Sequence, residues 1–470
     1  MMPSQTPPAP SEDSTWVTPP RRGAERVTGA GPAIITAERI LTGRRGDAAG
    51  TLEVLADPVH GVGVLLDGPR ITAVGPLPEL QDQAGAALER LERLDLPGAT
   101  LMPGLIETHA HLATSGTDIE YPEYGVHEVA RLTLNAVRAI RELASVGITS
   151  VQSLGARHYV DVALRDAIDD GSLRGPRLRA SGPQITTTGG HSWHAGAEVD
   201  GLDDIRRAVR DHHKRGVDTV KFMATGGFTT AASLPWNAQF TAEEMALIVA
   251  ETHRLGHLSA AHAHGTQGIE RAVDAGIDYL AHASFISASG RTEFDPALAD
   301  RIAEAGIYVD CTITADVPGM IERNPDFAPP ARQLWERGVR IVAGHDTGIP
   351  QVAHRSYVAG LQALEEVGLP RAEVILAATS RAAAAIGLAG ITGALAPGYE
   401  ADIIAVASDP TEGLGALHTL RAVIMRGREF VPDPVQGLPR IDDPDPAADP
   451  AIVLAAHRDS IRRINEHPNV

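Results

Sequence analysis

The chain has 470 residues, of which 43% are hydrophobic and 21% are charged. This size and composition exclude a wholly disordered protein and predict a large core with a smaller second domain. The formal net charge is −19, from 41 Lys and Arg against 60 Asp and Glu. Because such an excess of negative charge repels polyanions, we do not expect nucleic acid as a partner.

Cysteine usage and hydropathy predict where the protein works. Cys311 is the only cysteine and lies in a largely apolar run, so we expect a buried thiol and no intramolecular disulfide. The sequence has no run of about 20 apolar residues, and its N-terminus lacks a basic segment followed by a hydrophobic one. We therefore predict a cytoplasmic protein with no membrane partner.

The N-terminal part of the chain divides into two segments. Residues 1–32 are rich in Pro, Ser, Thr and charge, which predicts a flexible arm. Short β-type runs separated by Gly, Pro and Asp turns follow from 33 to 102, and similar runs return from 391 to 431. We expect these two flanks to pair into one small β-sandwich domain.

Residues 103–390 alternate short apolar runs with helical patterns. The clearest helical pattern spans 127–146, and another near 243–255 begins with a capping box of Thr241 and Glu244. Eight such units predict an α/β protein whose central domain is a (β/α)8 TIM barrel. The predicted strands are centred near Ile106, Thr149, Leu178, Val220, Ala260, Tyr279, Val309 and Val342.

The chain ends in an extension from 432 to 470. Apolar residues at helical spacing predict a helix within it: Ile452, Leu454, Ile461 and Ile464. Because such a helix can dock its apolar face on a second copy of the chain, we expect a homo-oligomer.

Polar side chains able to bind a metal recur at the ends of the predicted barrel strands. His109 and His111 end the first strand, where residues two apart project to the same face. A buried lysine or aspartate is costly unless it is compensated, and TIM barrels place their catalytic groups at this rim. Later strands end with Lys221, His262, His282 and Asp346.

The motifs around these residues resemble those of the amidohydrolase superfamily, and the resemblance spans 33 to about 431. The run 102–111 resembles the first-strand signature of the family, and 220–227 resembles its fourth strand. The fourth-strand motif places the chain near the branch in which a carboxylated lysine bridges two metal ions. One departure is Gln152-Ser153 in the second strand, where relatives commonly carry Arg-Asp. Further resemblances lie at 261–265, 281–283, 343–346 and 397–402.

The resemblance implies a set of ligands for two divalent metal ions per chain. Zinc is the expected metal, and cobalt or manganese also suit histidine and carboxylate ligands. A lysine ammonium between two cations would be repelled, whereas carbon dioxide converts it into a carbamate anion. In this assignment His109, His111 and Asp346 hold one ion, His262 and His282 hold the other, and carboxylated Lys221 bridges them.

The resemblance also implies catalytic roles and a pocket. Metal-activated hydroxide attacks the substrate, Asp346 acts as general acid and base, and His191 of the Gly-Gly-His segment stabilises the oxyanion. For His191, a structural role in holding its loop is the alternative. The candidates for the substrate pocket are Trp193, His194, Phe222, His264 and Tyr121.

Two segments that follow barrel strands, 184–198 and 224–238, contain no Lys or Arg, which favours a small, largely neutral substrate. We therefore predict hydrolysis of an amide, urea, carbamate or thiocarbamate bond, as in phenylurea and molinate hydrolases. Arg291 and Arg355 leave open a second function, a dipeptidase or N-acyl amino acid hydrolase similar to prolidases and ochratoxinase. A single-metal deaminase is disfavoured by Lys221, and a non-catalytic scaffold by the complete set of metal-ligand types.

Overall fold

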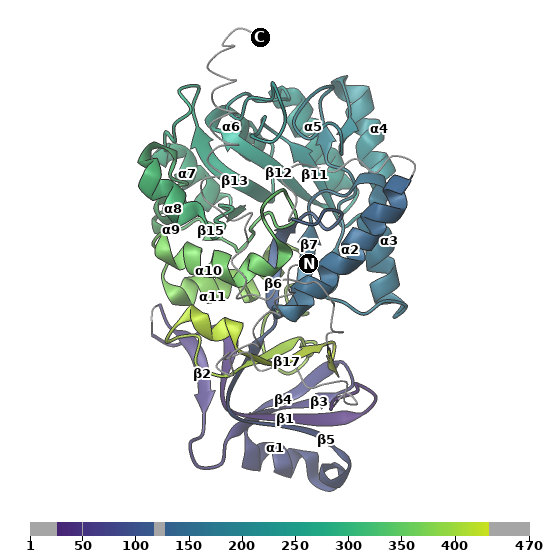
Figure 1. Ribbon diagram of the computed structural model, residues 1–470, viewed down its shortest axis with the longest axis vertical. Helices are drawn as coiled ribbons and strands as arrows, with labels where there is room; N and C mark the ends of the chain where they lie inside the picture. The colour runs from purple at the N-terminus through teal and green to yellow at the C-terminus, as the bar shows by residue number, and fades with distance from the viewer. Residues whose placement is uncertain (1–25, 49, 117–126, 432–470) are drawn as a thin grey trace, which may run out of the picture.

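The computed structural model describes residues 26–48, 50–116 and 127–431. The C-terminal extension, Tyr121 and residues 1–25 of the predicted arm lie outside the described residues. Figure 1 shows an eight-stranded sheet at one end of the molecule and, at the other, a larger part in which helices surround strands. In the described ranges, no helix is both long and apolar enough to cross a membrane.

Eight parallel strands form the centre of the larger part. Each predicted strand centre falls within one of them except Val342, which directly follows the last. The short strands β9 (Ile185–Thr186) and β10 (Ala197–Glu198) extend the ladder beside the fourth. The eight are β6 (Leu105–Ala110), β7 (Ile148–Ser153), β8 (Arg177–Arg179), β11 (Thr219–Met223), β12 (Leu258–Gly265), β13 (Tyr279–Ile286), β14 (Tyr308–Asp310) and β15 (Arg340–Ile341).

These strands form two hydrogen-bonded runs, β6 to β8 and β11 to β15. Backbone hydrogen bonds join the runs at both junctions. Asp218 N donates to Ala180 O over 2.8 Å, and His111 N donates to Thr347 O over 2.7 Å. The protein therefore has a TIM-barrel-like α/β fold, in agreement with the predicted alternation of strands and helices.

Helices pack around the strands (Figure 1). The predicted capping box is present, because Thr241 accepts from the Glu244 backbone and Glu244 accepts from the Thr241 backbone. The first of these helices ends just before Gly147, whose φ of 88° suits glycine. They are α2 (Glu128–Ser145), α3 (Val160–Asp169), α4 (Gly201–Lys214), α5 (Ala242–Arg254), α6 (Thr266–Asp274), α7 (Pro296–Glu304), α8 (Val317–Arg323), α9 (Ala331–Glu336), α10 (Tyr357–Glu366), α11 (Arg371–Ala377) and α12 (Ser380–Ala385).

The N- and C-terminal flanks meet in the eight-stranded sheet, because β16 pairs antiparallel with β5. The strands form one continuous sheet in the order β18-β17-β16-β5-β1-β3-β4, and β2 pairs with β1. The strand pairing does not divide this sheet into the two separate sheets of the predicted sandwich. Helix α1 (Leu77–Ala84), which the sequence analysis did not predict, packs Leu80 against Leu65. The strands are β1 (Pro32–Arg45), β2 (Leu52–Ala56), β3 (Val62–Asp67), β4 (Arg70–Pro76), β5 (Glu92–Pro103), β16 (Ile403–Val406), β17 (Leu420–Met425) and β18 (Arg428–Glu429).

Candidate metal centre

The six predicted metal ligands lie at the carboxyl ends of barrel strands. Parallel strands bring these ends to one rim, so residues far apart in the sequence become neighbours. His109 and Lys221 are 1% exposed, and all the others except the partly exposed His111 are buried as well. The six are His109 in β6, His111 directly after it, Lys221 in β11, His262 in β12, His282 in β13 and Asp346 after β15.

The first group of ligands converges on one carboxylate oxygen. His109 Nε2 lies 3.1 Å from Asp346 Oδ1, and His111 Nε2 lies 3.0 Å from the same oxygen. His282 also reaches this group, since donor atoms of His109, His282 and Asp346 lie within 4.8 Å of one another. Contacts between these nitrogens and a carboxylate oxygen are attractive only when a proton or a metal cation lies between them.

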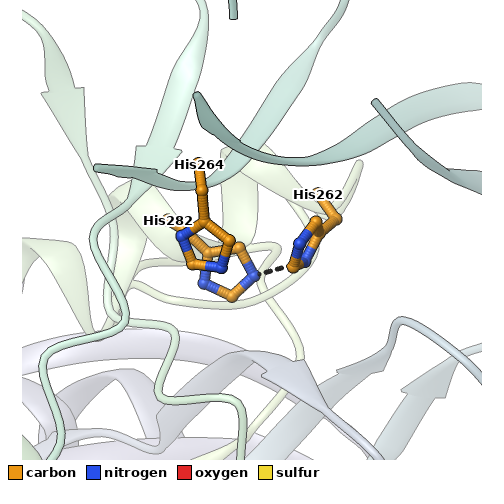
Figure 2. Close-up of side chains that lie close together, drawn as sticks. All are labelled: His262, His264 and His282. Carbon is orange, nitrogen blue, oxygen red and sulfur yellow. Dashed lines mark hydrogen bonds between the residues drawn. The ribbon is translucent and has the colours of Figure 1, made fainter. Parts of the chain in front are cut away.

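The second group consists of three imidazoles. Figure 2 shows His262 and His282 joined by a contact between their rings, with His264 beside His282. His282 Nε2 lies 2.8 Å from His262 Nδ1, and the rings of His264 and His282 stack with centroids 4.3 Å apart. Donor atoms of all three lie within 4.8 Å of one another. The two groups share His282, so two cation sites would adjoin each other.

Hydrogen bonds at the outer ring nitrogens orient these imidazoles. His262 Nε2 lies 3.0 Å from the carbonyl oxygen of Gly226, and His111 Nδ1 lies 3.3 Å from that of Gly155. A carbonyl oxygen only accepts, so each of these nitrogens must donate its proton. The opposite nitrogens, His262 Nδ1 and His111 Nε2, therefore present lone pairs toward the other ligands, as a metal site requires.

Burial disfavours protonation of the imidazoles in the second group. It holds the pKa values of His262 and His282 well below their usual range, and the charges of neighbouring imidazoles and Lys221 act in the same direction. A proton shared between the two facing nitrogens is therefore unfavourable. Neutral imidazoles with converging lone pairs, beside one carboxylate, are the donors that zinc and similar ions bind in proteins. The residues thus fit a divalent metal.

Lys221 and Asp346 complete the electrostatics of the centre. Burial lowers the pKa of Lys221 to about 8, although the charges of Asp346 and Asp310 oppose this lowering. Burial by itself would raise the pKa of Asp346, but the charge of His109 and the hydrogen bond from His111 outweigh it and hold the pKa below its usual range. A neutral lysine amine is the form that reacts with carbon dioxide, so the pocket suits carboxylation of this side chain.

The structure places His191, His194 and His264 close to the ligands or to the loop beside them. The His191 ring lies 4.4 Å from that of His262, and burial lowers the pKa of His191 to about 3. Any side chain at Gly227 would overlap the His191 ring, so glycine is required there. His264 Nδ1 lies 3.0 Å from Ser284 Oγ, beside the His282 ring. His194 is half-buried next to Trp193.

The aromatic pocket candidates occupy different environments. Trp193 is 48% exposed on the loop that carries His191, where it is accessible to a substrate. Phe222 is fully buried, packs against Phe240 at 6.3 Å and belongs to the main hydrophobic core. This packing favours a core role for Phe222 over the predicted pocket role, because neighbouring residues of a strand face opposite sides and Lys221 faces the ligands.

Two buried carboxylates beside the ligands were not predicted. Glu107 Oε1 accepts from the backbone N of His109 over 2.8 Å and from that of His345 over 3.2 Å, which ties the first strand to the segment carrying Asp346. Asp310, at the end of β14, lies 3.0 Å from His109 Nδ1. Both are charged residues in buried strands, the same signal that pointed to the candidate ligands. Cys311, which directly follows Asp310, is buried as predicted.

Two of the candidate ligands at this rim have strained backbone conformations. His282 has a φ of 72° and Asp346 a φ of 56°, values that side chains other than glycine rarely adopt. Each such residue costs on the order of 1 to 3 kcal/mol, and such residues cluster at functional sites. The strain therefore marks the centre independently of the residue types that form it.

The sequence profile of the amidohydrolase family matches residues 100–437. The chain therefore belongs to the amidohydrolase family. It is an enzyme, a metal-dependent hydrolase that acts on carbon–nitrogen bonds. The match covers the barrel strands, every predicted metal ligand and the return of the chain into the eight-stranded sheet.

Curated relatives and solved structures agree with this family. Ochratoxinase from Aspergillus niger is 28% identical over 413 residues, which are 78% of this chain and 82% of the relative. The crystal structure of a Xaa-Pro dipeptidase with bound methionine has a TM-score of 0.72 at 26% identity and covers 85% of this chain and 100% of its own. Molinate hydrolase has a TM-score of 0.71 at 19% identity and covers 88% of this chain and 98% of its own. The last likeness bears on the fold alone.

Proposed function

We propose that the protein binds two divalent ions and hydrolyses an amide, urea, carbamate or thiocarbamate bond of a small, largely neutral substrate. The observation that carries the proposal is the His262–His282 pair, whose facing nitrogens lie 2.8 Å apart although burial disfavours a proton between them. Zinc is the expected metal, with cobalt and manganese as alternatives. The proposed ligands are His109, His111 and Asp346 for one ion, His262 and His282 for the other, and carboxylated Lys221 between them.

The side chains around the ions divide the catalytic work. When bound, two such ions supply a water molecule that loses its proton near neutral pH, and they polarise the carbonyl under attack. Asp346, held by His109 and His111, accepts that proton and returns it to the departing nitrogen or sulfur. His191 beside His262 donates a hydrogen bond to the developing oxyanion. Trp193, His194 and His264 contact the remainder of the substrate.

Metal removal and a panel of substrates test this function. We expect two ions per chain in the purified protein, loss of turnover after dialysis against a chelator, and recovery when zinc is returned. The panel contains a neutral aryl urea, a thiocarbamate and an N-acyl amino acid, each followed by release of the amine or thiol. Turnover that persists in the metal-free protein would contradict the proposal, as would the absence of turnover on every member of the panel.

A dipeptidase or N-acyl amino acid hydrolase is the second candidate function, and Arg355 favours it. Arg355 lies in the short helical turn His354–Ser356, in the loop that follows Asp346 and β15. Its Nη1 atom is buried and has no hydrogen-bond partner within the described ranges. The same loop is fixed near the ligands, because His354 Nε2 donates to the carbonyl oxygen of Thr114 over 3.1 Å. Arg355 as a whole is partly exposed, and a buried guanidinium nitrogen without an acceptor suits a substrate carboxylate.

Arg355→Gln is expected to separate the two candidate functions. For an N-acyl amino acid, kcat/KM should fall roughly 10- to 100-fold, since a hydrogen bond to a charged group contributes about 1.5 to 3 kcal/mol. For the matched carboxamide, which lacks the negative charge, kcat/KM should stay near that of the wild type. Arg291→Gln is the control, because Arg291 already pairs with Asp326 at 3.4 Å. Equal losses on both substrates would favour the neutral-substrate function.

We also propose a domain organisation, an oligomeric state and a cellular location for the protein. Residues 103–390 close into a (β/α)8 barrel, while 33–102 and 391–431 form a separate β-sandwich domain, supported by the pairing of β5 with β16. The helical pattern within 432–470 supports a homo-oligomer, and the single cysteine supports a cytoplasmic location.

A further inference from the structure

Asp310 contacts one proposed ligand, His109, and also Thr312, which in turn contacts a second proposed ligand, His282. It lies at the end of β14, is fully buried and is not one of the proposed ligands. Asp310 Oδ2 accepts from Tyr279 OH over 2.8 Å and lies 3.0 Å from His109 Nδ1. Asp310 Oδ1 accepts from the backbone N of Thr312 over 2.9 Å and from Thr312 Oγ1 over 2.6 Å.

The first of these contacts fixes the orientation of His109. A carboxylate accepts hydrogen bonds, so the imidazole donates from Nδ1 and keeps a lone pair on Nε2. That lone pair points at Asp346 Oδ1, 3.1 Å away, where the first ion is proposed to bind. Asp310 therefore sets both the tautomer and the direction of this ligand.

Thr312 connects Asp310 to His282, a proposed ligand of the second ion. Its only hydroxyl proton is given to Asp310, so Thr312 Oγ1 acts as an acceptor toward His282 Nδ1, 2.8 Å away. His282 thus donates from Nδ1 and presents the lone pair of Nε2 to His262. Thr312 is held rigidly for this task, because its backbone N also donates to Asp310 and its φ is 51°.

We propose that Asp310 is a positioning residue that orients one ligand of each metal ion and so couples the filling of the two sites. The proposal rests on the binuclear centre put forward above. It predicts that substitutions of Asp310 and of Thr312 disturb different numbers of ligands. Loss of the Asp310 carboxylate disturbs His109 directly and His282 through Thr312, whereas loss of the Thr312 hydroxyl disturbs His282 alone.

Zinc titration of the chelator-stripped protein tests the asymmetry. Removing a partner of a metal-binding imidazole costs about 10- to 100-fold in metal affinity. We therefore expect Asp310→Asn to weaken both binding steps by that factor, and the isosteric Thr312→Val to weaken only one. Thr312→Ser, which keeps the hydroxyl, should restore both steps. Visible absorption of the cobalt-substituted protein provides a second readout, and in Thr312→Val it should change for one of the two ions.

Tyr279→Phe is the matched control, since it removes one hydrogen bond to Asp310 without touching an imidazole. It should leave both zinc affinities near those of the wild type. If Asp310→Asn and Thr312→Val each bound both zinc ions with the affinities of the wild type, the proposed role of Asp310 would be wrong. It would also be wrong if Thr312→Val weakened both binding steps. A wild-type protein that binds at most one ion would instead refute the binuclear centre, and the coupling with it.

Discussion

Replacing Lys221 by alanine is expected to remove most of the bound metal and to lower kcat/KM on the order of 10³-fold, because metal ions supply several kcal/mol of transition-state stabilisation. Lys221 is the proposed bridge between the ions, and no other lysine is buried in the described part of the chain. Metal content by mass spectrometry of the native protein, together with turnover of the best substrate, provides the measurement.

Two variants separate loss of the carbamate from general damage. Lys221→Arg keeps a long cationic side chain that does not form a carbamate, so it should behave like the alanine variant. Lys214→Ala changes the only other lysine of the sequence, which is exposed on α4, and should leave metal content and turnover unchanged. If Lys221→Ala retained two ions and full turnover, the lysine would have a structural role and the proposed bridge would be wrong.

Asp346→Asn should separate binding from catalysis. The amide keeps an oxygen for the first ion but does not accept a proton, so kcat is expected to fall about 10²- to 10⁴-fold, the usual contribution of general acid and base catalysis. Metal content should stay well above that of Lys221→Ala. The measurement is kcat and KM on one amide substrate, paired with metal content of the same preparation.

Asp346→Ala provides the comparison for this second prediction. It removes both the proton acceptor and the oxygen that lies 3.0 Å from His111 and 3.1 Å from His109, so metal content should fall together with kcat. Equal kcat values for the asparagine variant and the wild type would exclude Asp346 as the group that transfers the proton.

The sequence revealed the candidate ligands because each stands out in its surroundings. A lysine, an aspartate and several histidines at the ends of apolar strands have few explanations other than a shared site, since burying them separately is costly. Their separation along the chain did not obscure the pattern, because a parallel barrel brings all its strand ends to one rim. The alternation of apolar runs with helical patterns placed the eight strands, although Val342 lies one residue beyond β15.

Packing and orientation needed the tertiary structure. Phe222 resembled a pocket residue in the sequence, but which side of β11 faces the core depends on the residues that pack against it, and Phe240 packs against Phe222 there. Glu107 and Asp310 were overlooked because their partners across the barrel, His345 and His109, are identified only when strands and loops are assembled. Hydrogen bonds of this kind depend on distances that no sequence pattern encodes.

The sequence by itself determined the α/β class and the strand positions and supplied the candidate metal ligands, because periodicity and the cost of burying charge can be judged from the chain alone. The tertiary structure decided which imidazole nitrogen of His262 faces the other candidate ligands, the environment of Lys221 and the contact of Asp310 with His109. It also gave the left-handed backbone at His282 and Asp346. The contacts of His109 with Asp310 and Asp346 join segments more than a hundred residues apart, so only the folded chain brings these groups together.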